Sequence, residues 1–139
     1  MIQGLSHITF IVHDLDKMTR VITEVFGGRE VYASGAKQYS ISPEKFFEVG
    51  GIWIAVMQGD GLPTRTYNHV AFKVSVQQLA KAKLAIEKLG LELREPRPRI
   101  AGEAQSLYFY DDDNHHLFEL HTGTLEDRLA AYQELDQKP

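Results

Sequence analysis

Apolar and polar residues alternate near the start of the chain, as expected of a strand with one buried face. Over residues 5–12, alternation separates Ser6, Ile8, Phe10 and Val12 from Leu5, His7, Thr9 and Ile11. Asp14 can then cap a helix with apolar residues at helical spacing, ended by Gly27-Gly28: Leu15, Met18, Ile22, Val25 and Phe26. Short strands are predicted over 29–34 and 38–41, and a firmer one over 51–57, before the breaker at 59–63.

The second half of the chain repeats the first. At an offset of 62, five residues recur: His7 as His69, Phe10 as Phe72, Val12 as Val74, Gly28 as Gly90 and Glu30 as Glu92. At an offset of 64, Ile54 falls on Phe118, Ala55 on Glu119 and Gly59 on Gly123. Between these strands, Ser75 and Gln78 form a capping box before a helix that buries Leu79, Ala82, Ile86 and Leu89.

This pattern predicts an antiparallel-rich α+β fold in a single domain over residues 1–139. We expect module one over about 1–60, module two over about 65–123, and a C-terminal helix over about 124–136. That last helix carries Leu125, Leu129 and Tyr132 on one stripe, with Asp127 near its positive end. One such module could not bury its sheet alone, whereas two can.

Composition narrows the class of protein. The 139 residues contain no cysteine, which excludes a disulfide scaffold, a thiolate metal site and a cysteine nucleophile. The start, Met1 to Gly4, lacks the basic and apolar parts of a signal peptide, and no apolar run is long enough to span a membrane. We therefore expect a cytoplasmic protein. A net charge of −4 argues against nucleic acid as the main partner.

Three polar strand residues are candidate metal ligands. His7 and His69 fall on corresponding faces of corresponding strands, and Glu119 replaces the apolar residue expected within Leu-Phe-Glu-Leu-His. Taken singly, each could be a hydrogen-bonded core residue or lie on a wet strand face. Two histidines and a carboxylate together suit a divalent metal with open positions. The repeat adds a fourth slot at Ala55, where the missing ligand would leave room for substrate.

Other polar groups keep two interpretations open. The stretch that carries Arg94, Arg97 and Arg99, with Pro96 and Pro98 interleaved, is either a solvated linker or a site for an anion. Ser106 and Tyr108 share a strand face and could add hydroxyl donors, and Arg128 could reach the same cavity. Glu44 lies beside Phe46 and Phe47 as either a surface carboxylate or a base. The run Asp111 to His116 is typical of a turn, and His13 and His121 are interpreted as structural.

Several ordered segments resemble the fosfomycin resistance hydrolases of the FosX type, in the vicinal oxygen chelate (glyoxalase–bleomycin resistance) superfamily. The segments are 4–10, 42–47, Trp53, 67–72, 96–99, 106–111 and 118–125, and the resemblance covers about residues 1–130. It implies paired βαβββ modules in an intimate homodimer with swapped modules, bacterial and cytoplasmic. It also implies one metal, usually Mn(II), held by His7 of one subunit and by His69 and Glu119 of the other.

The same resemblance implies the chemistry. Water would open the epoxide of fosfomycin, the metal would stabilise the developing alkoxide, and Glu44 would act as general base. Pocket positions of the family fall on Thr9, Trp53, Tyr67, Ser106, Tyr108 and Arg128. Two departures matter: the His115-His116 turn is one residue longer than usual, and Ile100 to Glu103 lacks the serine-rich cation loop of the glutathione-using relatives. A thiol transferase opening the same epoxide and a non-catalytic antibiotic-binding module are the alternatives.

Overall fold

Two modules of the same topology make up the chain. The computed structural model describes residues 1–37, 39–95, 97–99 and 104–138. Module one contains β1 (His7–Val12), α1 (Leu15–Arg20), the π-helical turn η1 (Val21–Val25), β2 (Arg29–Ala33), β3 (Glu44–Val49) and β4 (Ile52–Gln58). Module two contains β5 (His69–Lys73), α2 (Val76–Lys88), β6 (Leu93–Arg94), β7 (Ser106–Tyr110), the 3-10 turn η2 (Asp112–Asn114) and β8 (Leu117–His121), followed by α3 (Leu125–Asp136).

The strand orders of the two sheets correspond one to one. They are β1-β4-β3-β2 and β5-β8-β7-β6, with the first pair of each sheet parallel and the others antiparallel. Thr9 pairs with Ala55, and Ala71 pairs with Glu119 in the same way. The predicted correspondence of position 55 with position 119 is therefore present in the register of the strands.

One predicted strand is misplaced. The sequence pattern favoured residues 38–41, but residue 38 lies outside the described residues and 39–41 form bends. The strand is β3 instead, beginning at Glu44 directly after Pro43. Alternation over β3 is obscured because Phe46 and Phe47 are both aromatic, although Phe47 is buried in the core and Phe46 lies on the opposite face.

The helices of both modules begin at the caps that the sequence predicts. Asp14 caps α1 by accepting from the backbone N–H groups of Asp16 and Lys17, and the Ser75–Gln78 capping box begins α2.

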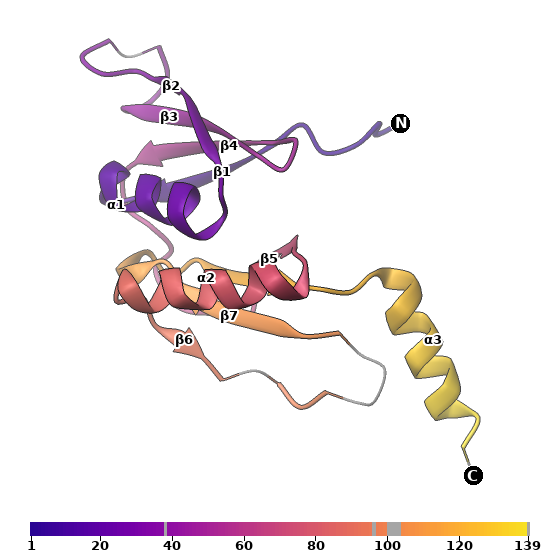
Figure 1. Ribbon diagram of the computed structural model, residues 1–139. Helices are drawn as coiled ribbons and strands as arrows, with labels where there is room; N and C mark the ends of the chain where they lie inside the picture. Colours follow the sequence, from indigo (N-terminus) through magenta and orange to yellow (C-terminus); the bar gives the residue numbers. More distant parts are fainter. Residues whose placement is uncertain (38, 96, 100–103, 139) are drawn as a thin grey trace.

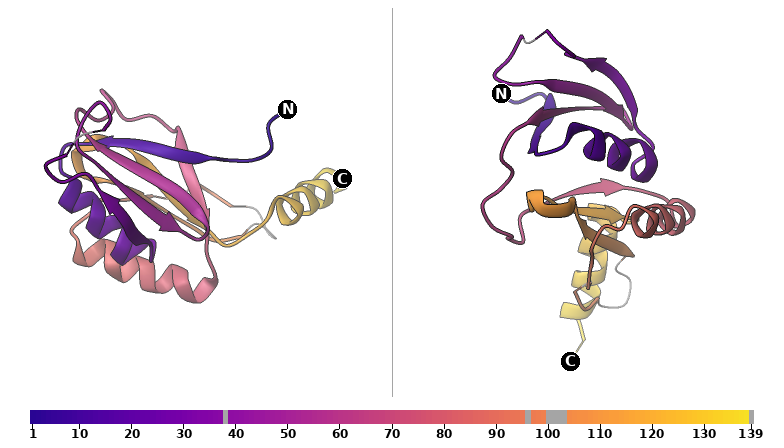
Figure 2. Two further views of the ribbon diagram at one scale, coloured as in Figure 1. Left: turned by 90° about the horizontal axis from the view of Figure 1, so that it is seen from above. Right: turned by 90° about the vertical axis from the view of Figure 1, so that its left-hand side faces the viewer.

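The hydrophobic core joins the two modules. The helices of both modules lie next to each other on one side of the sheets (Figures 1 and 2). Aromatic rings meet across the modules: Phe10 lies 5.1 Å from Phe118, and Phe26 lies 4.9 Å from Phe72, between ring centroids. One continuous apolar cluster therefore holds both halves.

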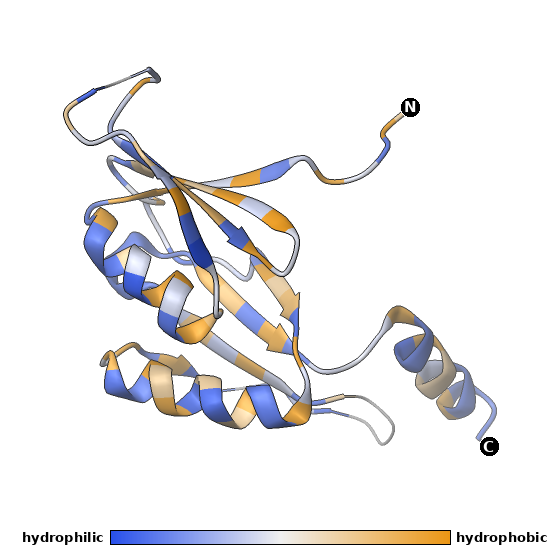
Figure 3. Cartoon of the chain, turned by 45° about the horizontal axis from the view of Figure 1, so that its top comes forward, coloured by the Kyte–Doolittle hydropathy of each residue, from blue (hydrophilic) through white to orange (hydrophobic). Residues whose placement is uncertain are grey.

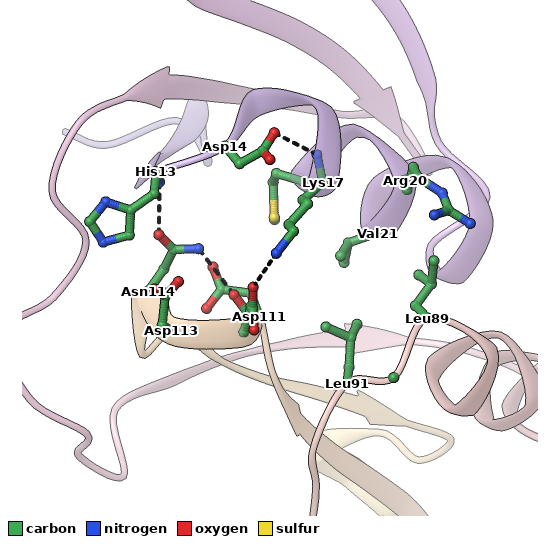
Figure 4. A pocket seen from close by; sticks show the side chains of 13 residues that line it. His13, Asp14, Lys17, Arg20, Val21, Leu89, Leu91, Asp111, Asp113 and Asn114 are labelled. Carbon is green, nitrogen blue, oxygen red and sulfur yellow. Dashed lines mark hydrogen bonds and ion pairs between the residues drawn. The ribbon is translucent and has the colours of Figure 1, made fainter.

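The turn between β7 and β8 also joins the modules through polar contacts. Asn114 Oδ1 accepts from the backbone N–H of His13 at 2.9 Å, and Lys17 pairs with Asp112 at 2.9 Å (Figure 4). His116 Nε2 lies 2.9 Å from the carbonyl oxygen of Ile11. At the start of this turn, Asp111 is 2% exposed. Its Oδ1 accepts from the backbone N–H of His116, and its Oδ2 is buried without a hydrogen-bond partner.

The longer turn leaves the following strand in phase. His115 ends the 3-10 turn in the left-handed region, at φ 66°, and β8 begins at Leu117. Phe118 and Leu120 point into the core, so Glu119 keeps its outward direction, as expected if the extra residue lies in the turn.

The C-terminal helix α3 projects away from the two modules (Figures 1 and 3). It begins with a capping box of Thr124 and Asp127. The predicted stripe of Leu125, Leu129 and Tyr132 is exposed along it. Among the helices described, none has both the length and the apolar character needed to cross a membrane.

Candidate active site

Each sheet turns one face toward the core and the other outward, and the candidate residues lie on the outward faces. On sheet one this face carries His7 and Thr9 of β1, Trp53 of β4 and Glu44 of β3. On sheet two it carries His69, Glu119, Ser106, Tyr108 and His121. The alternation of hydrophobic and hydrophilic residues that produces the two faces is visible along the strands in Figure 3.

His69 and Glu119 are paired on sheet two. The Nε2 atom of His69 lies 3.0 Å from Oε2 of Glu119. Its Nδ1 atom lies 2.7 Å from the carbonyl oxygen of Tyr67, which can only accept, so Nδ1 carries a proton. In a neutral ring Nε2 then presents a lone pair toward the carboxylate. Two lone-pair atoms held this close need a cation between them or a proton on the ring.

The surroundings of Glu119 favour its ionised form. The residue is 4% exposed, and burial on its own would raise the pKa of its carboxyl group. Hydrogen bonds from the hydroxyls of Ser106 and Tyr108, with the charges of His121 and His69, outweigh that effect and lower the pKa below its ordinary value. Glu119 is therefore a buried carboxylate whose surroundings favour the ionised form, which is the form that binds a cation.

His7 begins an aromatic row on sheet one. Its ring lies 4.2 Å from that of Trp53, whose ring lies 5.2 Å from Phe46, and Phe46 lies 5.0 Å from Tyr32. His7 Nδ1 is 3.0 Å from the hydroxyl of Ser6. Within the described part of one chain, no three His, Cys, Asp or Glu side chains are arranged to hold a metal ion. His7 is therefore not assembled with His69 and Glu119 inside a single chain.

Glu44 lies at the other end of the outward face of sheet one from His7. It is 8% exposed and pairs with Met57, which in turn pairs with Ile11 of β1. Its backbone N–H donates to the hydroxyl of Ser34 at 3.0 Å. It also lines a surface cavity that includes His13 and Lys45. The carboxyl group is thus fixed on rigid strands rather than on a loop.

The other hydroxyl and cationic candidates, Tyr67 and Arg128, lie near the neighbours of Glu119 on sheet two. Tyr67 donates to the hydroxyl oxygen of Tyr108 at 3.2 Å, and burial raises the pKa of Tyr108, which stays a neutral donor. Arg128 is half-buried at the start of α3, and its charge is among the causes that lower the pKa of His121, after burial and against the opposing effect of Glu119.

Two residues were not predicted from the sequence to lie beside Glu119: Arg99, a candidate only for binding an anion, and His121. Arg99 donates from Nη2 to Ser106 Oγ at 2.7 Å, to Tyr108 at 3.2 Å and to Glu119 Oε1 at 3.3 Å. His121, interpreted from sequence as structural, lies 2.7 Å from Ser106 Oγ through Nδ1. Alternation places His121 on the same face as Glu119, which was the available signal. Pro96 and the segment from Ile100 to Glu103 lie outside the described residues.

The donor set fits a divalent metal ion. His69 Nε2 and Glu119 Oε2 lie 3.0 Å apart, and an imidazole nitrogen beside a carboxylate oxygen is a pair of ligands that divalent first-row metals bind. The second nitrogen of His69 is held by a backbone carbonyl, the usual support of a metal-binding histidine. One chain supplies two ligands of this kind, and a facial set needs a third.

Comparisons of the sequence and the structure with known proteins point to the same superfamily. The pattern of the glyoxalase/bleomycin resistance protein/dioxygenase superfamily matches residues 4–120. The fosfomycin resistance protein FosX of Mesorhizobium japonicum is 58% identical over 94% of this chain and 93% of its own. The metallothiol transferase FosB of Staphylococcus epidermidis is 32% identical over 96% and 94%.

A solved structure has the same fold. It is that of a Glu-to-Gln mutant of FosX from Listeria monocytogenes, in complex with Mn(II) and 1S,2S-dihydroxypropylphosphonic acid. Its TM-score is 0.84 at 48% identity, covering 95% of this chain and 99% of that one.

Proposed function

Because the chain belongs to the glyoxalase/bleomycin resistance protein/dioxygenase superfamily, with FosX relatives at 51–58% identity, we propose that it adds water to the epoxide of fosfomycin. The product would be a vicinal diol, and the cell would become resistant to the antibiotic. The diol phosphonate bound in the Listeria FosX structure is the compound type that this addition yields, which supports hydration.

A thiol transferase acting on the same epoxide is the second candidate. It is favoured only by the relatives named metallothiol transferase, which are 31–33% identical to this chain. The buried carboxyl group of Glu44 on a rigid strand supports water as the nucleophile, since water needs a base near neutral pH. A binding module without catalysis would not require the paired His69 and Glu119.

His69 and Glu119 of one subunit and His7 of a second would hold the metal, which we propose is Mn(II). The bound ion would act as a Lewis acid toward the epoxide oxygen and a phosphonate oxygen. The separation of His7 from the other two ligands within one chain supports a site shared between the subunits of a homodimer with swapped modules.

The remaining residues would bind substrate and move protons. Glu44 would take a proton from the attacking water as the water oxygen bonds to an epoxide carbon and the bond from that carbon to the epoxide oxygen breaks. The former epoxide oxygen would then take a proton from solvent to complete the diol, and Glu44 would release its proton to solvent. The hydroxyl of Thr9 and the guanidinium of Arg128 would hold the phosphonate oxygens through charge-assisted hydrogen bonds. Tyr67 and Tyr108, whose hydroxyls donate to Tyr108 and to Glu119 in the protein without substrate, would line that side of the pocket. Trp53 would close the apolar side, and Ser106 would stand beside the metal-binding carboxylate.

Phosphorus NMR of fosfomycin incubated with purified protein and Mn(II) tests the reaction. Diol phosphonate should form without added thiol and should depend on the metal. Glu119→Ala should lose most of its bound Mn(II) in metal analysis and should give no product. Product that appears only with thiol would establish the transferase instead, and no product under either condition would refute both enzymes.

Mixing two inactive variants tests the shared site. Dimers of His7→Ala and dimers of Glu119→Ala each lack a ligand in both sites. In a mixed dimer, one site would receive the intact His7 and the intact Glu119 from different chains. Random exchange of subunits should therefore restore about a quarter of wild-type activity, by counting one good site in half of the dimers. No recovery after verified exchange would place all ligands in one chain.

A further inference from the structure

The hydroxyl of Ser106 lies at the centre of the polar groups around Glu119. Its Oγ atom is 2.6 Å from Glu119 Oε1, 2.7 Å from His121 Nδ1 and 2.7 Å from Arg99 Nη2. All three are short hydrogen-bond distances. Ser106 and Arg99 are partly buried, and Glu119 is 4% exposed. The geometry of this cluster fixes where its protons lie.

A serine hydroxyl has one proton to donate and two lone pairs to accept with. Glu119, as a carboxylate, can only accept, so the Ser106 proton goes to its Oε1. The guanidinium of Arg99 can only donate, and it uses one lone pair of Ser106. The remaining contact, with His121 Nδ1, must then be a donation by the ring. Nδ1 of His121 carries a proton whether or not the ring is charged.

We infer that His121 is a positioning residue that acts through Ser106 to aim the carboxylate of Glu119. The relay runs from His121 Nδ1–H to Ser106 Oγ and from the Ser106 hydroxyl to Glu119 Oε1. Arg99 Nη2 also reaches Oε1, at 3.3 Å. With Oε1 held on this side, Oε2 is the oxygen directed at His69. Supports of this kind tune metal affinity by about 10- to 100-fold.

The same proton count changes the role of Ser106. From the sequence, the hydroxyl of Ser106 is a candidate donor to the substrate. In the structure its only proton and both of its lone pairs are engaged by Glu119, His121 and Arg99, so no capacity is left for the substrate. Ser106 thus serves the ligand Glu119, and recognition of the phosphonate falls to the other donors of the pocket.

The inference rests on the proposed metal site, so the first test needs no metal. Nitrogen-15 NMR of the imidazole groups in the metal-free protein reports which ring nitrogen carries the proton. We expect a protonated Nδ1 for His121, assigned by its absence in His121→Asn. An unprotonated Nδ1 would overturn the relay without bearing on the reaction.

The second test measures Mn(II) affinity by the electron paramagnetic resonance of the free ion. His121→Phe and Ser106→Ala should each weaken binding by about 10-fold or more. His121→Asn, whose amide can donate from nearly the same place, should recover most of the loss. The double variant should be no weaker than Ser106→Ala, because His121 acts through that hydroxyl. His13→Phe, at the junction of the modules, is the matched control, and circular dichroism checks the fold.

The outcomes separate this inference from the proposed function. Wild-type affinity in His121→Phe, or additive losses in the double variant, would overturn the relay while leaving the enzyme intact. A Ser106→Ala variant that binds Mn(II) normally but raises KM for fosfomycin would return Ser106 to the substrate. A wild-type protein that does not bind Mn(II) would refute the proposed function, and the imidazole NMR would still decide the relay.

Discussion

Replacing Asp111 with asparagine should change how the stability of the protein depends on pH. Burial raises the pKa of this carboxyl group from 3.8 to about 7, although its hydrogen bond from the backbone of His116 opposes the shift. The folded chain therefore binds a proton that the unfolded chain releases at a much lower pH. Asparagine keeps the acceptor Oδ1 and has no proton to release. Figure 4 shows Asp111 within the turn that joins the modules.

The direction and the size of this pH dependence follow from the linkage between proton binding and folding. Below about pH 3.8 the carboxyl is protonated in both states, and its favourable contribution is fully present. As pH rises toward about 7, the free energy of unfolding falls by up to about 1.4 kcal/mol per pH unit, and the contribution is then lost. Between about pH 5 and pH 8.5 the loss is about 3 kcal/mol. Asp111→Asn should escape it.

Urea denaturation of the full chain at fixed protein concentration measures the effect. The free energy of unfolding of Asp111→Asn minus that of wild type should grow by about 3 kcal/mol from about pH 5 to pH 8.5. If the buried amide group of the new asparagine lacks a partner, it lowers the free energy of unfolding equally at every pH. It therefore shifts the difference between variant and wild type by a constant amount and does not change its pH dependence. Asp113→Asn removes the same charge from an exposed position of the same turn and is the control. A difference that stays constant with pH within about 0.5 kcal/mol would refute the buried, protonated carboxyl.

Three further changes test other parts of the molecule. Glu44→Gln should lower hydration of fosfomycin by at least about 100-fold with Mn(II) binding unchanged, because the amide cannot take the proton; hydration within about threefold of wild type would require another base. Arg128→Ala should weaken fosfomycin binding by about 1.5–3 kcal/mol in calorimetry, and an unchanged affinity would place Arg128 outside the pocket. Gly61→Ala puts a Cβ 2.7 Å from the carbonyl oxygen of Asn114 and should lower stability by about 1–3 kcal/mol in urea denaturation. An unchanged denaturation midpoint would show that the backbone segments at Gly61 and Asn114 can move apart at little cost in free energy.

The repeat and the outward faces of the strands could be predicted because both depend on local alternation. His7, His69 and Glu119 were assigned to the correct faces since their neighbours Phe10, Phe72 and Phe118 are core residues. Strand β3 was missed because adjacent aromatic residues serve opposite faces there. A row of rings that crosses four strands, from His7 to Tyr32, does not appear as a periodicity along any one of them.

The partners of Glu119 were harder to predict from sequence. Arg99 approaches Glu119 from the chain segment before β7, a contact between groups 20 residues apart that spacing does not encode. The proton relay depends on three distances around one oxygen atom. Residue types alone indicate that Ser106 can donate, but they do not say to which acceptor.

The order of strands also has a consequence for synthesis on the ribosome. Module one is complete once β4, ending at Gln58, has emerged, whereas module two needs β8, which ends at His121. The intervening 63 residues take about 3 to 13 seconds to translate at 5–20 residues per second. During that interval the apolar surface that will meet module two, with Phe10 and Phe26 in it, has no partner from the rest of the chain. A nascent chain halted between the modules is therefore the species most exposed to aggregation and most dependent on chaperones.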